Sequence, residues 1–241
     1  MKKLNAFQLK IIALIVMLMD HLYFSFPDVF PVWFHPLSRF VAPLFAFLMV
    51  EGLFHTRNRL KYNLRLWGWA IFMQMGNGVI NIAFLSKKVS VHNNIFITLA
   101  LGLTILNLFE LRKNCYGIKK WGLLVSCIGL ILLGVCVEGG FSVIPFILIT
   151  YFFRENKKKS IIGYLILSVI LFIMNYTPYE TLKMTINMMM YNSDFLFIMV
   201  VPFIFLYNGE RGVNNKFSKY LFYVFYPLHL WILAMIEFIS N

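Results

Sequence analysis

The chain has 241 residues, of which 60% are hydrophobic and only 13% are charged, and its mean hydropathy is +0.75. Soluble domains are about half apolar and about a quarter charged, so this composition predicts an all-α integral membrane protein and excludes a soluble domain. The net charge of +12 does not indicate nucleic-acid binding, because the basic residues lie in short clusters between apolar segments and not along one stripe.

Apolar segments of the length that a bilayer requires follow one another along the whole chain. They predict a polytopic bundle of about nine transmembrane helices, near residues 9–26, 37–54, 66–85, 93–110, 121–137, 140–153, 160–177, 193–207 and 218–238. For the stretch 177–192 the pattern leaves open an interfacial or a re-entrant segment. Because no linker or repeat divides the chain, we expect a single domain of residues 1–241.

Lysine and arginine are distributed unevenly between the predicted loops. The N-terminus and every second loop hold 18 of the 22 basic residues, namely Lys2, Lys3, Lys10, Arg57, Arg59, Lys61, Arg65, Arg112, Lys113, Lys119, Lys120, Arg154, Lys157, Lys158, Lys159, Arg211, Lys216 and Lys219. The opposite loops hold only Lys87, Lys88 and Lys183, and Arg39 lies within a span. Loops rich in Lys and Arg stay in the cytoplasm, so we expect a cytoplasmic N-terminus.

Asp20 and His21 interrupt the first predicted span, "LIVMLMDHLYFSFP". At about 1.5 Å of rise per residue they lie about 15 Å from the cytoplasmic edge, and His229 in the last helix reaches the same depth. Arg39 lies in the outer half of the second span. Ionisable groups inside a membrane are costly and mark functional sites, so this set predicts general acid/base chemistry. Neighbouring helix residues point about 100° apart, so we expect Asp20 to meet Arg39 or another helix.

Structural roles for the same residues remain open. Asp20 and Arg39 are also compatible with an ion pair between helices, and His229 with a hydrogen bond to a carbonyl freed by Pro227. A transporter or flippase that relays protons through Asp20, His21 and His229 is the rival functional class. The sequence shows no matched pair of halves with broken helices, which many transporters have. A scaffold without activity would leave the buried ionisable set unexplained.

Two cytoplasmic segments are candidates for binding a phosphate-bearing donor. The loop "HTRNRLKYNLRL" (55–66) sets the topology, and it is also dense in cations that can hold phosphates. The turn "YNGERG" (207–212) places Arg211 on the same face, where it is also compatible with a simple turn. No P-loop, dinucleotide-binding fingerprint or zinc motif is present in the sequence.

Several blocks of the sequence resemble the TraX family, which is named for an enzyme that acetylates the N-terminus of conjugative pilin. They are "LKIIALIVMLMDH", "RFVAPLFAFLMVEGLFHTRNRLKYNLRL", "NIFITLALG", "YNGERG" and "KYLFYVFYPLHL", and they extend from residue 9 to about residue 232. That family is similar to a wider group of transmembrane acyltransferases, which pass an acyl group from cytosolic acyl-CoA to an acceptor on the far side and in which a membrane-embedded His early in the chain is essential. His21 matches that His, and the resemblance leaves open whether it acts as a general base or takes the acyl group covalently. The string "FMQMGNGVI" and Gly139 depart from the family pattern, and they put the acceptor end in doubt.

The resemblance and the polar residues together predict a membrane-embedded acetyltransferase. It would use cytosolic acetyl-CoA, no metal and no nucleic acid, and would modify an amine or hydroxyl of an extracytoplasmic peptide or glycan from a bacterial cytoplasmic membrane. The expected catalytic residues are His21, Asp20, Arg39, His229 and Tyr226. The expected donor contacts are His55, Arg57, Arg59, Lys61, Tyr62, Arg65, Asn208 and Arg211. The expected acceptor contacts are Gln74 and Glu138.

Overall fold

The computed structural model describes residues 3–240, so Lys2 lies outside the described part. Within it the chain is helical, with no strand beyond an isolated bridge between Leu4 and Tyr207. The α-helices are α1 (Ala6–Ser25), α2 (Phe34–Ser38), α3 (Val41–His55), α4 (Arg59–Ala83), α5 (Ile95–Lys113), α6 (Gly117–Leu133), α7 (Gly140–Phe152), α8 (Lys157–Asn175), α9 (Leu182–Tyr191), α10 (Val200–Leu206) and α11 (Lys216–Ser240). Three short 3-10 helices accompany them, η1 (Leu85–Lys87), η2 (Gly134–Cys136) and η3 (Asp194–Met199).

The helices are those of a multi-pass helical membrane protein, but the expected count of about nine spans is not confirmed. In the described residues, six helices are long and apolar enough to cross a bilayer: α1, α2 with α3, α5, α6, α8 and α11. The stretch 182–206 adds a seventh if α9 and the η3–α10 unit count as one span bent by 58°. α7 is shorter, and α4 is outside this group because Gln74, Asn77 and Asn81 interrupt its apolar part.

Several helices begin earlier than their apolar stretches, because an Asn caps each N-terminus. The side chain of Asn58 accepts a hydrogen bond from the Lys61 backbone N–H at 2.8 Å, so α4 starts at Arg59 and not near residue 66. The side chain of Asn156 accepts one from the Lys159 N–H at 3.1 Å. Helical structure therefore continues into the basic segments.

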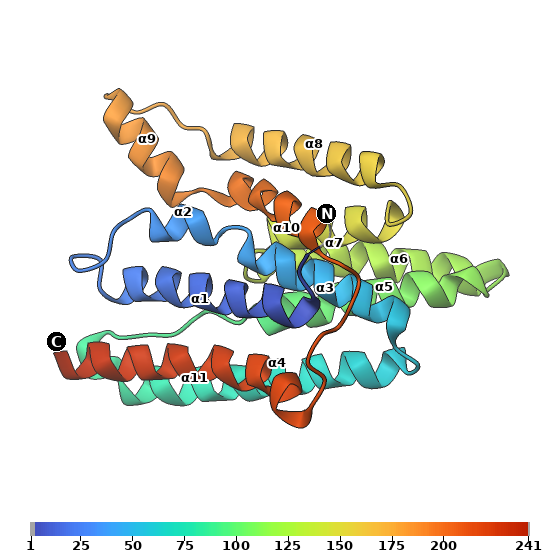
Figure 1. Ribbon diagram of the computed structural model, residues 1–241, viewed down its shortest axis with the longest axis horizontal. Helices are drawn as coiled ribbons and strands as arrows, with labels where there is room; N and C mark the ends of the chain where they lie inside the picture. Colours follow the sequence, from blue (N-terminus) through green and yellow to red (C-terminus); the bar gives the residue numbers. More distant parts are fainter. Residues whose placement is uncertain (1–2, 241) are drawn as a thin grey trace.

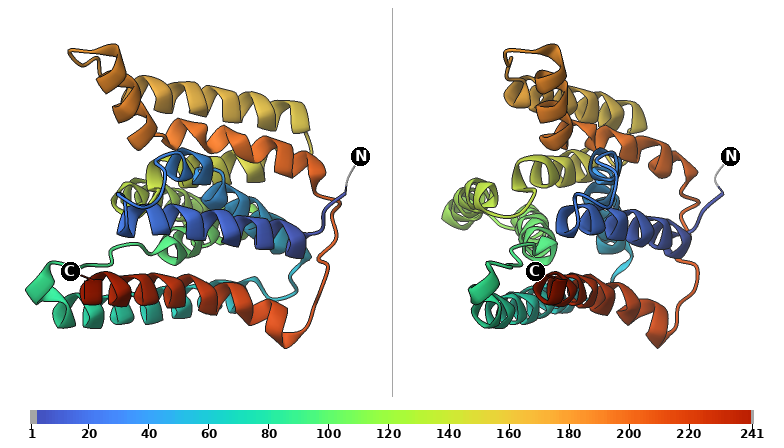
Figure 2. Two further views of the ribbon diagram at one scale, coloured as in Figure 1. Left: turned by 60° about the vertical axis from the view of Figure 1, so that its left-hand side comes forward. Right: turned by 90° about the vertical axis from the view of Figure 1, so that its left-hand side faces the viewer.

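Most helices run along the long axis of the molecule, and their connections alternate between its two ends (Figure 1). The N-terminus of α1, the α3–α4, α5–α6 and α7–α8 connections and the segment 207–215 lie toward one end, on the right in Figure 1 and in the left-hand view of Figure 2. This end carries the basic segments of the sequence, and we call it the basic end. The α1–α2, α4–α5 and α8–α9 connections lie toward the opposite end.

The segment 207–212 crosses the basic end and fixes the start of α1. The Ala6 N–H donates to the Glu210 carbonyl at 2.9 Å, which satisfies one of the free donors at the helix N-terminus. Gly212 has φ +74°, and a Cβ there would overlap the side chain of Asn5. The segment can follow this path only with glycine at that position, and the path places Arg211 beside α1.

The core lies around α3, which packs against α1, α5 and α7. Of the α2–α3 span 61% is buried, whereas α6 is only 11% buried and packs against α5 at the periphery. Gly102 allows α5 to approach α7 closely, since a Cβ there would lie 2.5 Å from the Ile147 side chain. The interior-facing side of α1 is therefore enclosed by α3 and α11, and that is where the polar residues of the sequence meet.

Candidate active site

Two adjoining cavities run through the centre of the bundle. The inner one, which we call the chamber, has a volume of about 390 Å³ and is walled by α1, α3, α5, α11 and the turn before α7. The outer one, at the basic end, has a volume of about 470 Å³, and we call it the vestibule. The two cavities meet at six residues that line both of them, which we call the neck: Lys10, Leu48, Tyr62, Lys219, Phe222 and Tyr223.

The vestibule is lined by four cations, Lys10, Arg65, Arg211 and Lys219. Within residues 3–240 no carboxylate forms an ion pair with any of them. The one acid on the wall, Glu51, is already held by Arg154 on the far side of the wall. Four cations without counter-charges around one cavity are suited to bind an anion such as a phosphate group.

Glu51 forms an ion pair with Arg154, so its carboxylate does not offset the cations of the vestibule. Arg154 contacts both carboxylate oxygens, Nε to Oε1 at 2.8 Å and Nη2 to Oε2 at 3.1 Å. The hydrogen bonds that Arg154 donates to Glu51 raise the pKa of Arg154 above its usual value. The guanidinium also lies over the Phe54 ring, 4.4 Å from its centroid. Glu51 is therefore committed to the protein.

Half of the expected donor contacts lie on the vestibule wall. They are His55, Tyr62, Arg65 and Arg211. The other four do not line either cavity: Arg57, Arg59, Lys61 and Asn208. The Arg59 guanidinium is 2.9 Å from a Glu110 carboxylate oxygen, and the Asn208 amide is bonded to Glu210 within the turn. These two side chains are used for structure.

Sequence reasoning assigned Lys10 and Lys219 to topology and missed their place in the neck. A signal for Lys10 was available, because it shares one face of α1 with Leu14, Met17 and His21 at helical spacing. The Lys10 ammonium lies over the Phe222 ring, 5.0 Å from its centroid. That face of α1 extends from Lys10 in the neck to His21 in the chamber.

His21 lines the chamber, and His229 of α11 lies directly against it. His21 Nδ1 lies 2.6 Å from His229 Nε2, and His229 Nδ1 lies 2.8 Å from the carbonyl oxygen of Phe225. Because a carbonyl only accepts, His229 Nδ1 carries a hydrogen, and neutral His229 then accepts at Nε2. His21 must donate from Nδ1, which leaves Nε2 of His21 as an unprotonated base. This network fixes the tautomer of both rings.

The alternative role for His229 is a hydrogen bond to a carbonyl freed by Pro227, but the structure shows a different partner. Pro227 removes the backbone hydrogen bond to the carbonyl of Tyr223. The His229 ring, however, bonds the carbonyl of Phe225, not the freed one. His229 therefore does not repair the backbone at Pro227; the hydrogen bond to Phe225 orients the ring, and its other nitrogen orients His21.

Asp20 meets Arg39, as expected from its direction on α1. Arg39 Nη2 is 3.0 Å from Asp20 Oδ2, and Arg39 Nη1 is 3.3 Å from Asp194 Oδ1. His35 Nδ1 lies 2.8 Å from Asp20 Oδ1. We call Asp20, His35, Arg39 and Asp194 the Arg39 cluster. Sequence reasoning missed His35 and Asp194, although His35 and Arg39 are four residues apart and so share a face where the chain continues helically past α2.

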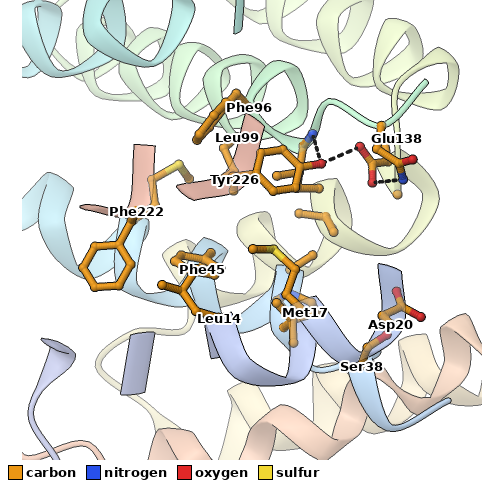
Figure 3. Close-up of a pocket in the computed structure, with 18 of the residues that line it drawn as sticks. Leu14, Met17, Asp20, Ser38, Phe45, Phe96, Leu99, Glu138, Phe222 and Tyr226 are labelled. Atoms are coloured by element: carbon orange, nitrogen blue, oxygen red, sulfur yellow. Dashed lines mark hydrogen bonds between the residues drawn. The ribbon is translucent and has the colours of Figure 1, made fainter. Parts of the chain in front are cut away.

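Glu138 lies on the opposite wall of the chamber from Asp20, close to Tyr226 (Figure 3). Its carboxylate accepts hydrogen bonds from the Asn93 amide at 3.0 Å, from the Asn94 backbone N–H and from the Tyr226 hydroxyl at 3.3 Å. No cation forms an ion pair with it within residues 3–240. Glu138 lies in the turn between η2 and α7, and burial raises its pKa.

Gln74, the other expected acceptor contact, is placed elsewhere. Its side chain is exposed on α4, outside the walls of the chamber, and its oxygen accepts a hydrogen bond from the Asn94 amide at 3.2 Å. It therefore supports the segment that bonds Glu138. In the described part of the chain, no three His, Cys, Asp or Glu side chains are grouped so that they could hold a metal ion.

Known proteins are similar to this chain over the residues that form the site. A family model described as TraX protein matches residues 6–237. The chain belongs to the TraX family. Its sequence is also 28% identical over 248 residues to the probable fimbrial assembly protein FimC, serogroup H1, of Dichelobacter nodosus, covering 95% of this chain and 94% of that protein. No solved structure matches the chain. The TraX match includes every residue of the vestibule, the neck and the chamber.

Proposed function

We propose that this TraX-family protein is a membrane-embedded acyltransferase that transfers an acetyl group from acetyl-CoA to an acceptor on the other side of the membrane. The observation that carries the proposal is the vestibule with four cations that have no carboxylate partner within residues 3–240, joined through the neck to a chamber whose wall includes His21, oriented by His229 behind it. The vestibule suits the phosphates of the nucleotide. The chamber suits a thioester, because its walls between the neck and His21 are mostly apolar.

The distance along α1 supports CoA as the donor. Lys10 and His21 are eleven residues apart on one helix, which corresponds to about 16 Å. An extended pantetheine arm has a similar length and is thin and flexible enough to pass the neck. Phosphates near Lys10, Arg65 and Arg211 would therefore bring the thioester close to His21.

We propose that His21 is the general base. Nε2 of His21 takes the proton of the acceptor's amine or hydroxyl while the acceptor's nitrogen or oxygen attacks the thioester carbonyl carbon. The C–S bond then breaks, and the CoA sulfur receives the proton from Nε2 of His21. His229 accepts the hydrogen bond from Nδ1 throughout, so it stabilises the imidazolium that forms. Arg39 holds the Asp20 carboxylate in place next to His21.

The acceptor end favours an amine. Glu138 is a buried carboxylate on the chamber wall with only neutral donors around it, so a protonated amine would supply the missing cation. The ammonium group would leave one proton on the Glu138 carboxylate and attack the thioester as the neutral amine. The fimbrial assembly name of the Dichelobacter relative supports a peptide acceptor, such as the subunit of a surface fibre. A glycan hydroxyl is the less favoured acceptor, because it would leave Glu138 without a counter-charge.

We propose that the protein lies in a bacterial cytoplasmic membrane with its basic end in the cytosol. The support is the positive-inside rule, since Lys and Arg concentrate at that end and acetyl-CoA is a cytosolic donor. The acceptor would then approach the Arg39 cluster and Glu138 from outside.

The test compares envelope peptides and glycans by mass spectrometry in cells with and without the gene. The expected result is one acetyl group on a peptide amine that disappears with the gene. Purified protein in proteoliposomes should also release the CoA thiol from acetyl-CoA only when that acceptor is added. The absence of any acetylated product from cells that make the protein would refute the proposal.

A proton-coupled transporter is the second candidate, favoured by the direct His21–His229 hydrogen bond, which could relay protons. It predicts uptake into proteoliposomes that depends on a pH gradient and no release of CoA thiol. The two candidates are therefore separated by the same preparation.

A further inference from the structure

His35 is a buried residue of α2 whose two ring nitrogens both face oxygen acceptors. Nδ1 lies 2.8 Å from the Asp20 carboxylate, and Nε2 lies 2.9 Å from the backbone carbonyl of Tyr191, the last residue of α9. The side chain is almost fully enclosed, at 6% exposure. A neutral imidazole has one N–H and can satisfy only one of these acceptors, whereas an imidazolium satisfies both.

His35 lies between two groups that carry negative charge. The carboxylates of Asp20 and Asp194 share a single guanidinium, that of Arg39. The C-terminal carbonyls of α9 also carry partial negative charge. The imidazole ring therefore faces negative groups on both sides.

The other groups that face His35 do not offer an alternative partner for its protons. Arg39 Nη2 lies 3.2 Å from Nδ1 and is itself a donor, so it opposes the charge but accepts no proton. Tyr23 of α1 and Tyr191 of α9 face the imidazole with their rings, at centroid distances of 6.4 and 5.9 Å. Phe24 of α1 contributes an aromatic edge at 4.7 Å.

We propose that His35 is a positioning residue that ties the carboxylate of Asp20 in the chamber to the C-terminal end of α9. The tie fixes Asp20 next to His21 and holds α9 against Phe24 and His35, two residues of the chamber wall. A displacement of α9 would therefore also displace His35 and Asp20 in the chamber wall. The effect on acetyl transfer rests on the proposed function, whereas the tie between His35 and α9 does not.

Two substitutions separate the two contacts of His35. The amide of Asn in His35→Asn reaches the position of Nδ1 and can donate to Asp20 but not to Tyr191. The amide of Gln in His35→Gln reaches the position of Nε2 and can donate to Tyr191 but not to Asp20. Each variant therefore keeps one half of the tie.

The first readout is the exposure of α9. Thr185 of α9 is 6% exposed, so Thr185→Cys in full-length protein with Cys115, Cys127 and Cys136 replaced by Ser reports the release of α9 to a water-soluble maleimide. His35→Asn should raise the labelling rate about tenfold, and His35→Gln should leave it within about twofold. Thermal unfolding in detergent, compared with the native protein, shows that both variants are folded.

The second readout is acetyl transfer. His35→Gln should lower kcat about 100-fold with little change in the KM for acetyl-CoA, because Asp20 loses its position but the vestibule is intact. His35→Asn should retain most of kcat. Equal labelling in both folded variants would overturn the tie. If the protein with native His35 shows no acetyl transfer, the proposed function fails, and the labelling arm still decides whether His35 holds α9.

Discussion

The vestibule and the Arg39 cluster both concentrate charge inside an apolar bundle, but they differ in how the charges are paired. In the vestibule four cations line one cavity and none has a carboxylate partner within residues 3–240. In the Arg39 cluster every charge has a partner at 2.8 to 3.3 Å. Like charges gathered around one cavity repel one another, so the vestibule is suited to a ligand that brings the counter-charge. Paired charge marks groups that stay in position during the reaction.

The largest expected effect comes from the base itself. His21→Ala should lower kcat for acetyl transfer about 1,000-fold, because no other group in the chamber has a free basic nitrogen fixed by a hydrogen bond. Binding of acetyl-CoA, measured by calorimetry, should be nearly unchanged. His92→Ala, in an exposed loop, is the matched control and should keep full activity. Full transfer by His21→Ala would exclude the mechanism.

Breaking the paired cluster should mainly affect stability. Arg39→Ala leaves Asp20 buried without its guanidinium and should lower the free energy of unfolding by about 3 kcal/mol. Asp194→Asn should cost less than about 1 kcal/mol, because the Asp194 side chain is 43% exposed and water screens its pair with Arg39. Thermal unfolding in detergent measures both. Equal losses in the two variants would mean that the cluster does not depend on burial.

Removing a cation from the vestibule should affect donor binding with little loss of stability. Arg211→Ala should raise the KM for acetyl-CoA about tenfold, since one charge-assisted hydrogen bond to phosphate is lost, and should leave kcat nearly unchanged. Arg57→Ala is the matched control, because Arg57 is an exposed cation that lines neither cavity. The KM should also rise with salt for the native protein. A KM that responds equally to both substitutions would place the donor outside the vestibule.

The smallest expected effect concerns Glu138 and pH. Burial raises its pKa, so the carboxyl group gains its proton at a higher pH than an exposed one does. The charged form is needed to attract a protonated amine, and the KM for the acceptor should therefore rise about threefold as the pH falls through that raised pKa. Glu138→Gln should show a KM that is high and independent of pH in this range. A native profile that is flat would argue against an amine bound at Glu138.

Helices α1 and α4 show how much of a helix can be predicted from its local sequence pattern. The apolar stretch 9–26 and the observed Ala6–Ser25 nearly coincide, because hydrophobic length is a local property. The depth of Asp20 and His21 followed from the same count of residues. For α4 the cap at Asn58 places the start of the helix at Arg59. The polar residues within its apolar part keep α4 out of the group of clear spans.

The sequence by itself determined the class of protein, the course of most helices, the basic end and the depth of His21, His229 and Asp20, because each depends on the order and spacing of residues along one helix. Only the tertiary structure decided that Lys10 and Lys219 line the neck, that Arg59 pairs with Glu110 away from the vestibule, and that His35 joins Asp20 to α9. Those contacts join residues as far apart as His35 and Tyr191. They depend on which face each helix turns toward its neighbours, and helix packing sets this, not the local pattern.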